Sequence, residues 1–108
     1  MRYEVFVGTD LIGVTALEKG DPPMGVASGR MFPTDQYQPA KHAGSTVSGL
    51  RIRPEGAEFF ELQGAYIEDY SPELGEDGLE VTILGLGHLE YAEHFPQHLK
   101  AYEERFKA

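Results

Sequence analysis

Hydrophobic and polar residues alternate along several stretches of the chain, and this alternation predicts β-strands. In residues 79–84 a hydrophobic residue stands at every second position, and Glu80 and Thr82 stand between them. A period of two places successive side chains on opposite faces of a sheet, so one face of this strand is expected to be buried. Residues 2–7 show a similar alternation. Further strands are predicted at residues 11–17, 25–31, 46–53 and 58–70.

Turn-forming residues separate these strands. Residues 8–10, Gly-Thr-Asp, lie between the first two predicted strands, which are therefore expected to pair as a β-hairpin. Pro22 and Pro23 each lack a backbone N–H donor, so neither a helix nor a central strand is expected to run through them. Residues 71–78 form an acidic loop with one expected helical turn, in which Ser71 is the capping residue.

The end of the chain has a different period. Residues 89–95 predict a short helix, and Pro96 suits the first turn of a second helix. In that second helix Leu99, Tyr102 and Phe106 are spaced by three and four residues, which places them on one face. We therefore expect an amphipathic C-terminal helix.

Together these elements predict an α+β domain. Its mainly antiparallel sheet has about five or six strands, forms either an open sheet or a half-barrel, and is covered by the C-terminal helix. A chain of 108 residues is long enough for one hydrophobic core, so residues 1–108 are expected to form a single domain. Hydrophobic residues make up 41% of the sequence, as in ordinary globular proteins, which argues against a chain that is disordered throughout.

The charge of the chain is strongly uneven, and its formal net value is −9. Residues 1–54 contain six basic and five acidic side chains, whereas residues 55–108 contain three basic and thirteen acidic side chains. Such a field repels nucleic acids and anionic lipid surfaces and attracts cationic surfaces. The distribution therefore argues against nucleic-acid and membrane binding and favours a basic protein partner.

The composition also indicates a compartment. The sequence has no cysteine, which rules out disulfides and thiolate chemistry and agrees with a reducing environment. No run of apolar residues approaches the roughly 18 that a membrane-spanning helix needs, and residues 1–8 are more typical of a first strand than of a signal peptide. A cytoplasmic location is the expectation.

The candidate partner-binding residues come from two segments, the acidic stretch in the second half of the chain and the stiff loop around Pro22 and Pro23. Prolines that hold Met24 outward would reduce the entropy lost on binding. The alternative interpretations are an acidic surface that only keeps the protein soluble, and a rigid connection with Met24 packed inward. The candidate set is Asp21, Met24, Glu68, Asp69, Glu73, Glu76, Asp77 and Glu80.

The histidines are the main candidates for chemistry. His94 and His98 have the spacing that places two imidazoles on one helical face, but Pro96 lies between them and the glutamate of a zinc-protease motif is missing. Ordinary surface or helix-capping histidines are therefore expected, and neither a metal nor a cofactor is predicted. The sequence has no nucleophile motif and no phosphate-binding glycine loop, which favours a protein that is not an enzyme.

One segment carries a resemblance to other proteins. Residues 17–30, Leu-Glu-Lys-Gly-Asp-Pro-Pro-Met-Gly-Val-Ala-Ser-Gly-Arg, resemble a segment of small uncharacterised bacterial single-domain proteins. Residues 80–85 and the pair Phe95-Pro96 are similar to the same group. The resemblance implies a bacterial single-domain protein and assigns no function and no site residue.

The leading functional hypothesis is an acidic protein-interaction module. Its most concrete form is an immunity protein that blocks a basic bacterial toxin such as a nuclease, since complementary charge speeds association. A second hypothesis is a small ligand-binding or enzymatic domain with its site between the sheet and the C-terminal helix. A third is a structural homo-oligomer that associates through an exposed sheet edge. The site of the second hypothesis would use Tyr66, Tyr70, His88, Tyr91 and His94.

Overall fold

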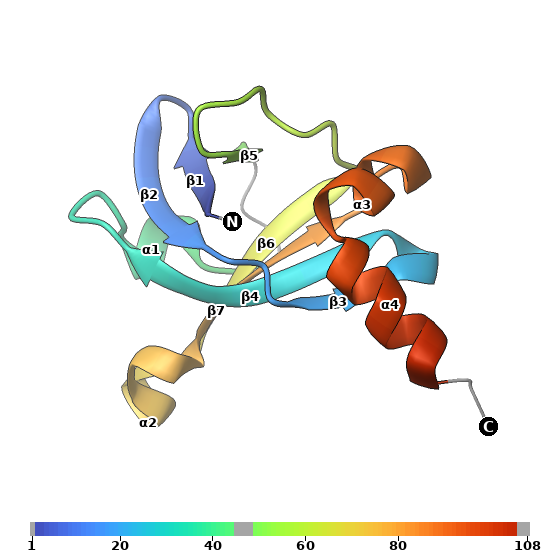
Figure 1. Cartoon of the computed structure of the whole chain (residues 1–108). Helices are drawn as coiled ribbons and strands as arrows, with labels where there is room; N and C mark the ends of the chain where they lie inside the picture. The colour runs from blue at the N-terminus through green and yellow to red at the C-terminus, as the bar shows by residue number, and fades with distance from the viewer. Residues whose placement is uncertain (1, 45–48, 106–108) are drawn as a thin grey trace.

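The computed structural model describes residues 2–44 and 49–105 of the chain. These residues form one antiparallel sheet, several short helical turns and a pair of helices at the C-terminal end (Figure 1). The strands are β1 (Tyr3–Val7), β2 (Asp10–Thr15), β3 (Lys19–Asp21), β4 (Val26–Pro33), β5 (Leu50–Pro54), β6 (Gly64–Asp69) and β7 (Leu79–Leu84). The helices are α1 (Pro39–His42), α2 (Ser71–Leu74), α3 (His88–His94) and α4 (Pro96–Arg105), and the 3₁₀ helices are η1 (Pro22–Met24) and η2 (Gly75–Gly78).

The strands pair in the order β5–β1–β2–β4–β7–β6, and β3 pairs with β4 beside this main path. The sheet curves into a half-barrel, in which β5 comes close to β6. The prediction of an α+β fold with an antiparallel sheet and a C-terminal helix is confirmed. Within the described residues, no helix is long and apolar enough to cross a membrane.

β4 is the central strand of the sheet. One of its edges pairs with β3 and then with β2, and its other edge pairs with β7. The pairing of β4 with β7 ends at Arg30 and Glu80, whereas its pairing with β2 continues to Pro33. The last residues of β4 therefore extend beyond β7 and leave one end of the sheet open.

Alternate strand residues form the hydrophobic core. Ile67 of β6 and Val81 and Ile83 of β7 are fully buried, as the period of two predicts for β7. Burial of one such side chain stabilises the fold by about 2 kcal/mol, which exceeds the ~0–1 kcal/mol of a typical exposed ion pair. The core consists of Tyr3, Val5, Ile12, Leu17, Ala27, Met31, Ile52, Phe60, Ile67, Leu79, Val81, Ile83, Leu86, Tyr91 and Phe95.

Helices α3 and α4 pack on the sheet through aromatic rings. The ring centre of Phe95 lies 5.4 Å from that of Tyr3, and the ring of His98 stacks on Phe95 at 5.2 Å. Tyr91 and Phe95 are almost fully buried, and His98 is 7% exposed. The expectation of surface histidines is therefore wrong for His98, because this side chain is part of the packed interior.

His98 also supplies a hydrogen bond to a strained turn. Its Nε2–H donates to the carbonyl oxygen of Leu17 at 2.7 Å. Leu17 has a φ of 46°, in the left-handed region that costs a non-glycine residue about 1–2 kcal/mol. The N–H of Leu17 donates to the hydroxyl of Thr15 at 3.1 Å. Helix α4 thus holds the connection between β2 and β3 in place.

The structure corrects several predicted boundaries. Within the predicted strand at residues 58–70, only Gly64–Asp69 is a strand, because the preceding residues cross from β5 to β6. The short strand β3 was not predicted, because its three residues are all exposed and carry no hydrophobic alternation. Residues 46–48 of a predicted strand, and Phe106 on the predicted helix face, lie outside the described residues.

The packing of β3 against the C-terminal helices gives a test of the fold. A Cβ added at Gly20 would clash with the Tyr91 hydroxyl and the His98 ring, and both side chains are fixed by hydrogen bonds. We expect Gly20→Ala to lower the free energy of unfolding by about 1–3 kcal/mol, the usual effect of overpacking. Urea unfolding followed by circular dichroism measures this change.

Gly64→Ala is the matched control for this experiment. Its Cβ would make an ordinary contact with Leu84 Cδ1 at 3.6 Å, so its stability should stay close to that of the wild type or rise slightly. Equal losses of stability in the two variants would contradict the described packing around Gly20.

Candidate functional site

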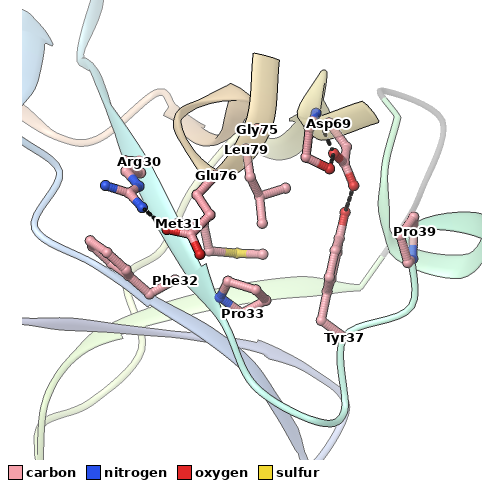
Figure 2. A pocket seen from close by; sticks show the side chains of 11 residues that line it. Arg30, Met31, Phe32, Pro33, Tyr37, Pro39, Asp69, Gly75, Glu76 and Leu79 are labelled. Atoms are coloured by element: carbon pink, nitrogen blue, oxygen red, sulfur yellow. Dashed lines mark hydrogen bonds and ion pairs between the residues drawn. The ribbon is translucent and has the colours of Figure 1, made fainter. Parts of the chain in front are cut away.

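A cavity of about 620 Å³ lies at the end of the sheet where β4 extends beyond β7. Its volume is within the range of binding pockets, roughly 300–1,000 Å³. Figure 2 shows that residues from distant parts of the chain line it. The lining residues are Arg30, Met31, Phe32, Pro33, Tyr37, Pro39, Asp69, Ser71, Gly75, Glu76 and Leu79.

Residues 71–78, here called the α2–η2 segment, project from this end of the sheet (Figure 1). The N–H of Tyr70 donates to the carbonyl of Gly78 at 2.8 Å, which closes the segment at its base. A Cβ on Gly78 would lie 2.7 Å from the backbone of Tyr70, so only glycine fits there. Pro72 lies in the first turn of α2, where backbone N–H groups have no partner within the helix. Proline therefore fits there without the loss of a hydrogen bond.

Asp69 is the centre of a polar cluster on the cavity wall. The Tyr37 hydroxyl donates to Asp69 Oδ2 at 2.7 Å, and the N–H of Ser71 donates to Asp69 Oδ1 at 2.9 Å. The Ser71 hydroxyl donates to the same Oδ1. Burial alone would raise the pKa of Asp69, but the hydrogen bonds from Ser71 and Tyr37 outweigh it and hold this pKa below its ordinary value. Burial, followed by the hydrogen bond to Asp69, raises the pKa of Tyr37.

Asp69 has no cationic partner among residues 2–44 and 49–105. The ion pairs of these residues involve other carboxylates, and the donors to Asp69 are neutral hydroxyl and amide groups. An ionised carboxylate that is held only by neutral donors keeps its full negative charge. This part of the cavity wall is therefore electronegative.

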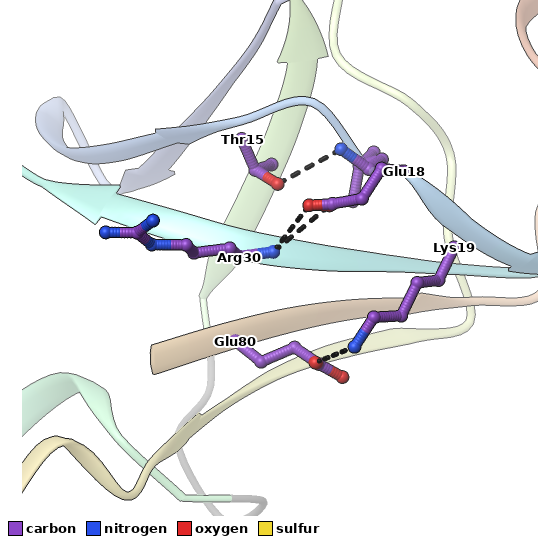
Figure 3. Close-up of polar contacts among 6 residues, drawn as sticks. Thr15, Glu18, Lys19, Arg30 and Glu80 are labelled. Atoms are coloured by element: carbon purple, nitrogen blue, oxygen red, sulfur yellow. Dashed lines mark hydrogen bonds and ion pairs between the residues drawn. The ribbon is translucent and has the colours of Figure 1, made fainter. Parts of the chain in front are cut away.

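Arg30 lines another part of the cavity. Its Nη2 lies 3.1 Å from Glu76 Oε2, and its Nη1 lies 3.1 Å from Asp77 Oδ1. Its guanidinium carbon lies 4.5 Å from the ring centre of Phe32. The Nε atom is buried and has no hydrogen-bond partner among the described residues. The backbone N–H of Arg30 donates to both carboxylate oxygens of Glu18, at 3.0 and 3.2 Å (Figure 3).

Most of the predicted partner-binding residues lie at this end of the molecule. Asp21 and Met24 are the exceptions, because they lie at the beginning of β4, close to α4. Met24 is 68% exposed, so the alternative interpretation with Met24 packed inward is wrong. The residues that the structure brings to the cavity end are Glu68, Asp69, Glu73, Glu76, Asp77 and Glu80.

Several of these carboxylates have partners within the chain. Glu68 and Glu80 stand opposite each other in the β6–β7 ladder, which is unfavourable for like charges. Lys19 Nζ lies 3.0 Å from Glu80 Oε2 (Figure 3), and the Tyr70 hydroxyl donates to Glu68 at 3.2 Å. Glu73 is exposed and forms no ion pair with any described residue. The unpaired acidic surface at this end of the sheet is therefore smaller than the sequence suggests.

The residues of the alternative site do not come together beneath the C-terminal helix. Tyr91 is 2% exposed and packs against His98 in a filled interior. His88 lines a different cavity of about 390 Å³, and Tyr66 and Tyr70 line another of about 440 Å³. Among the residues that the structure describes, no three His, Asp or Glu side chains are grouped so that they could hold a metal ion.

Arg30, Tyr37 and Ser71 belong to the site but were not predicted as site residues. Arg30 carries no local signal, because its partner Glu76 lies 46 residues further along the chain. Tyr37 offers a weak signal, since an aromatic residue in a short polar connection between two prolines usually packs against a neighbouring element. Ser71 was expected only as a helix cap, and its side chain instead donates to Asp69.

Comparison with known proteins found no match, whether with protein family models, with curated proteins or with solved structures. The structure itself defines the class: a small α+β half-barrel with a cavity at the open end of its sheet. The function is therefore argued from the geometry and charge of this cavity and of the segment beside it.

The lowered pKa of Asp69 predicts a pH dependence of stability. A folded-state pKa below the unfolded value of 3.8 stabilises the protein at higher pH, and this contribution is lost as the pH falls through the folded pKa. We expect Asp69→Asn to be less stable than the wild type at neutral pH, and the difference to shrink below about pH 4. Urea unfolding of both proteins over this pH range measures the difference. A difference that stays constant would contradict the assigned hydrogen bonds, and Glu73→Gln serves as the control.

Proposed function

We propose that this chain is an acidic protein-interaction module that binds a basic protein partner through the α2–η2 segment. One observation carries the proposal: the projecting segment combines exposed hydrophobic side chains with carboxylates. Leu74 is 67% exposed, and Tyr70, at the base of the segment, is 52% exposed. Aromatic residues such as Tyr70 are typical of the side chains that contribute most to protein–protein affinity.

The charge of the segment favours a cationic partner. The α2–η2 segment contains Glu73, Glu76 and Asp77 and no basic residue. Two of these carboxylates share the single guanidinium of Arg30, so a negative charge remains. The hydrogen bond to Glu68, and then the negative charges of Glu68 and Glu73, raise the pKa of Tyr70, which agrees with a negative potential at this surface.

The ion pairs of Arg30 leave its carboxylates accessible. The side chain of Glu76 is 92% exposed and that of Asp77 is 85% exposed. Exposed ion pairs contribute only ~0–1 kcal/mol, because water and salt screen them. A cation of a partner can therefore compete for these carboxylates at little cost to the fold.

The segment is also held in shape before binding. The hydrogen bond between Tyr70 and Gly78 closes its base, and Asp69 accepts two hydrogen bonds from Ser71. A pre-organised loop loses less conformational entropy when a partner binds. The geometry thus supports recognition by a fixed surface.

Neutralisation of a basic bacterial toxin is the specific form of this function that the charge suits best. Complementary charge raises association rates, which a toxin inhibitor needs. A small acidic chain with an exposed loop has the properties required. We expect the tagged protein, used as bait at low salt, to recover a basic toxin domain.

Charge reversal on the segment tests the proposed interface. We expect Glu73→Lys to slow association with the recovered basic partner about tenfold at low salt, because it removes electrostatic attraction. The effect should diminish as ionic strength rises. Surface plasmon resonance at several salt concentrations measures the association rates.

Glu93→Lys is the matched control, since Glu93 is an exposed glutamate of α3 at the other end of the sheet. It changes the net charge by the same amount and should leave the association rate much closer to that of the wild type. Equal slowing by Glu73→Lys and Glu93→Lys would show that only net charge matters and would remove the α2–η2 segment from the interface.

A further inference from the structure

The cavity beside the α2–η2 segment has an acceptor position that no donor among the described residues occupies. The two oxygens of an ionised carboxylate offer about four acceptor positions. Asp69 accepts hydrogen bonds from the Tyr37 hydroxyl, the Ser71 N–H and the Ser71 hydroxyl. Because all three donors are neutral, a charged donor in the cavity would gain both a hydrogen bond and an ion pair.

The lining of the cavity has a net negative charge although Arg30 belongs to it. Asp69 and Glu76 are the lining carboxylates, and Arg30 is the lining cation. Two negative charges thus accompany one positive charge. An anion that approached the unpartnered Nε of Arg30 would meet this negative potential, so the cavity favours a cation.

The rest of the cavity is apolar. Met31 and Leu79 are almost completely buried beneath it, and Pro33 and Pro39 complete this surface (Figure 2). A long basic side chain has an aliphatic stem that packs on such a surface while its charged end reaches polar groups. The volume of about 620 Å³ is sufficient for such a side chain.

We infer that this cavity receives an arginine side chain of the basic partner, an inference that rests on the proposed function. A guanidinium is less strongly hydrated than an ammonium group, so it is easier to transfer into a cavity with apolar walls. It also presents five N–H donors in a planar fork, which suits acceptors on separate walls, here Asp69 and Glu76. The α2–η2 segment then provides the outer contact surface, and the cavity selects the anchoring residue.

Titration with short peptides tests the inference without the natural partner. The probe is the acetylated peptide amide Gly-Arg-Gly, and two matched peptides carry citrulline or glutamate in place of arginine. NMR spectra of the ¹⁵N-labelled protein are recorded up to millimolar peptide. We expect the arginine peptide to shift the amide signals of Tyr37, Ser71 and Leu79. It should bind about tenfold more tightly than the citrulline peptide, which has the same shape but no charge, and the glutamate peptide should not bind.

Two carboxylate variants form a matched pair. Glu76 and Asp77 both pair with Arg30, but only Glu76 lines the cavity. We expect Glu76→Gln to weaken binding of the arginine peptide several-fold and Asp77→Asn to leave it nearly unchanged. Asp69→Asn should weaken it about tenfold or more. The dispersion of the amide signals shows whether each variant is folded. If Asp69→Asn is not folded, Glu76→Gln alone tests the inference.

Several outcomes would overturn the inference: no binding of the arginine peptide, equal binding of the citrulline peptide, binding of the glutamate peptide, or equal effects of Glu76→Gln and Asp77→Asn. These outcomes are distinct from failure of the proposed function. If Glu73→Lys slows association with the partner but the arginine peptide does not bind, the interaction module stands and the arginine pocket fails. If the arginine peptide binds and Glu73→Lys behaves like Glu93→Lys, the pocket stands and the proposed interface fails.

Discussion

The fold and the candidate site both depend on the point at which β4 stops pairing with β7. Its pairing with β7 stops at Arg30 and Glu80, whereas its pairing with β2 continues to Pro33. A strand edge without a neighbour has to be covered by other segments or be left to solvent. Tyr37 and the α2–η2 segment cover part of this end of the sheet, and the space between them is the cavity. The same strand that organises the core therefore also opens the site.

The sequence predicts those parts of the fold that local patterns control. β7 was predicted from its alternation because its inward side chains, Val81 and Ile83, all meet the same core. β3 gave no such signal, since all three of its residues are exposed and its position depends on pairing with β4 and on contact with α4. The burial of His98 could not be predicted either. Its desolvation is offset by stacking on Phe95 and by a hydrogen bond to the distant Leu17, and both depend on the folded arrangement.

The same distinction applies to the site. The carboxylates of residues 68–80 could be predicted as one surface because they are close together in the sequence. Their neutralisation could not be predicted, since Lys19 reaches Glu80 across 61 residues and Arg30 reaches Glu76 across 46. These pairs lower the net negative charge of the surface. The carboxylates still remain accessible to another cation, because exposed ion pairs contribute at most about 1 kcal/mol each. The proposal that the α2–η2 segment binds a basic partner therefore rests on its projection from the sheet and on its exposed hydrophobic side chains as well as on its charge.

Charge and shape have different roles at this surface. Glu73 makes no ion pair with the described residues, so in the proposed interaction its charge would act mainly at long range and raise the rate of encounter. Asp69 is held by Tyr37 and Ser71 in one geometry, so it acts only on a group that enters the cavity. Long-range attraction does not distinguish one basic protein from another, whereas a fixed acceptor at the end of an apolar cavity does. For the proposed interaction we therefore expect selectivity from the groups held in one geometry around Asp69, and attraction from the carboxylates that project beyond it.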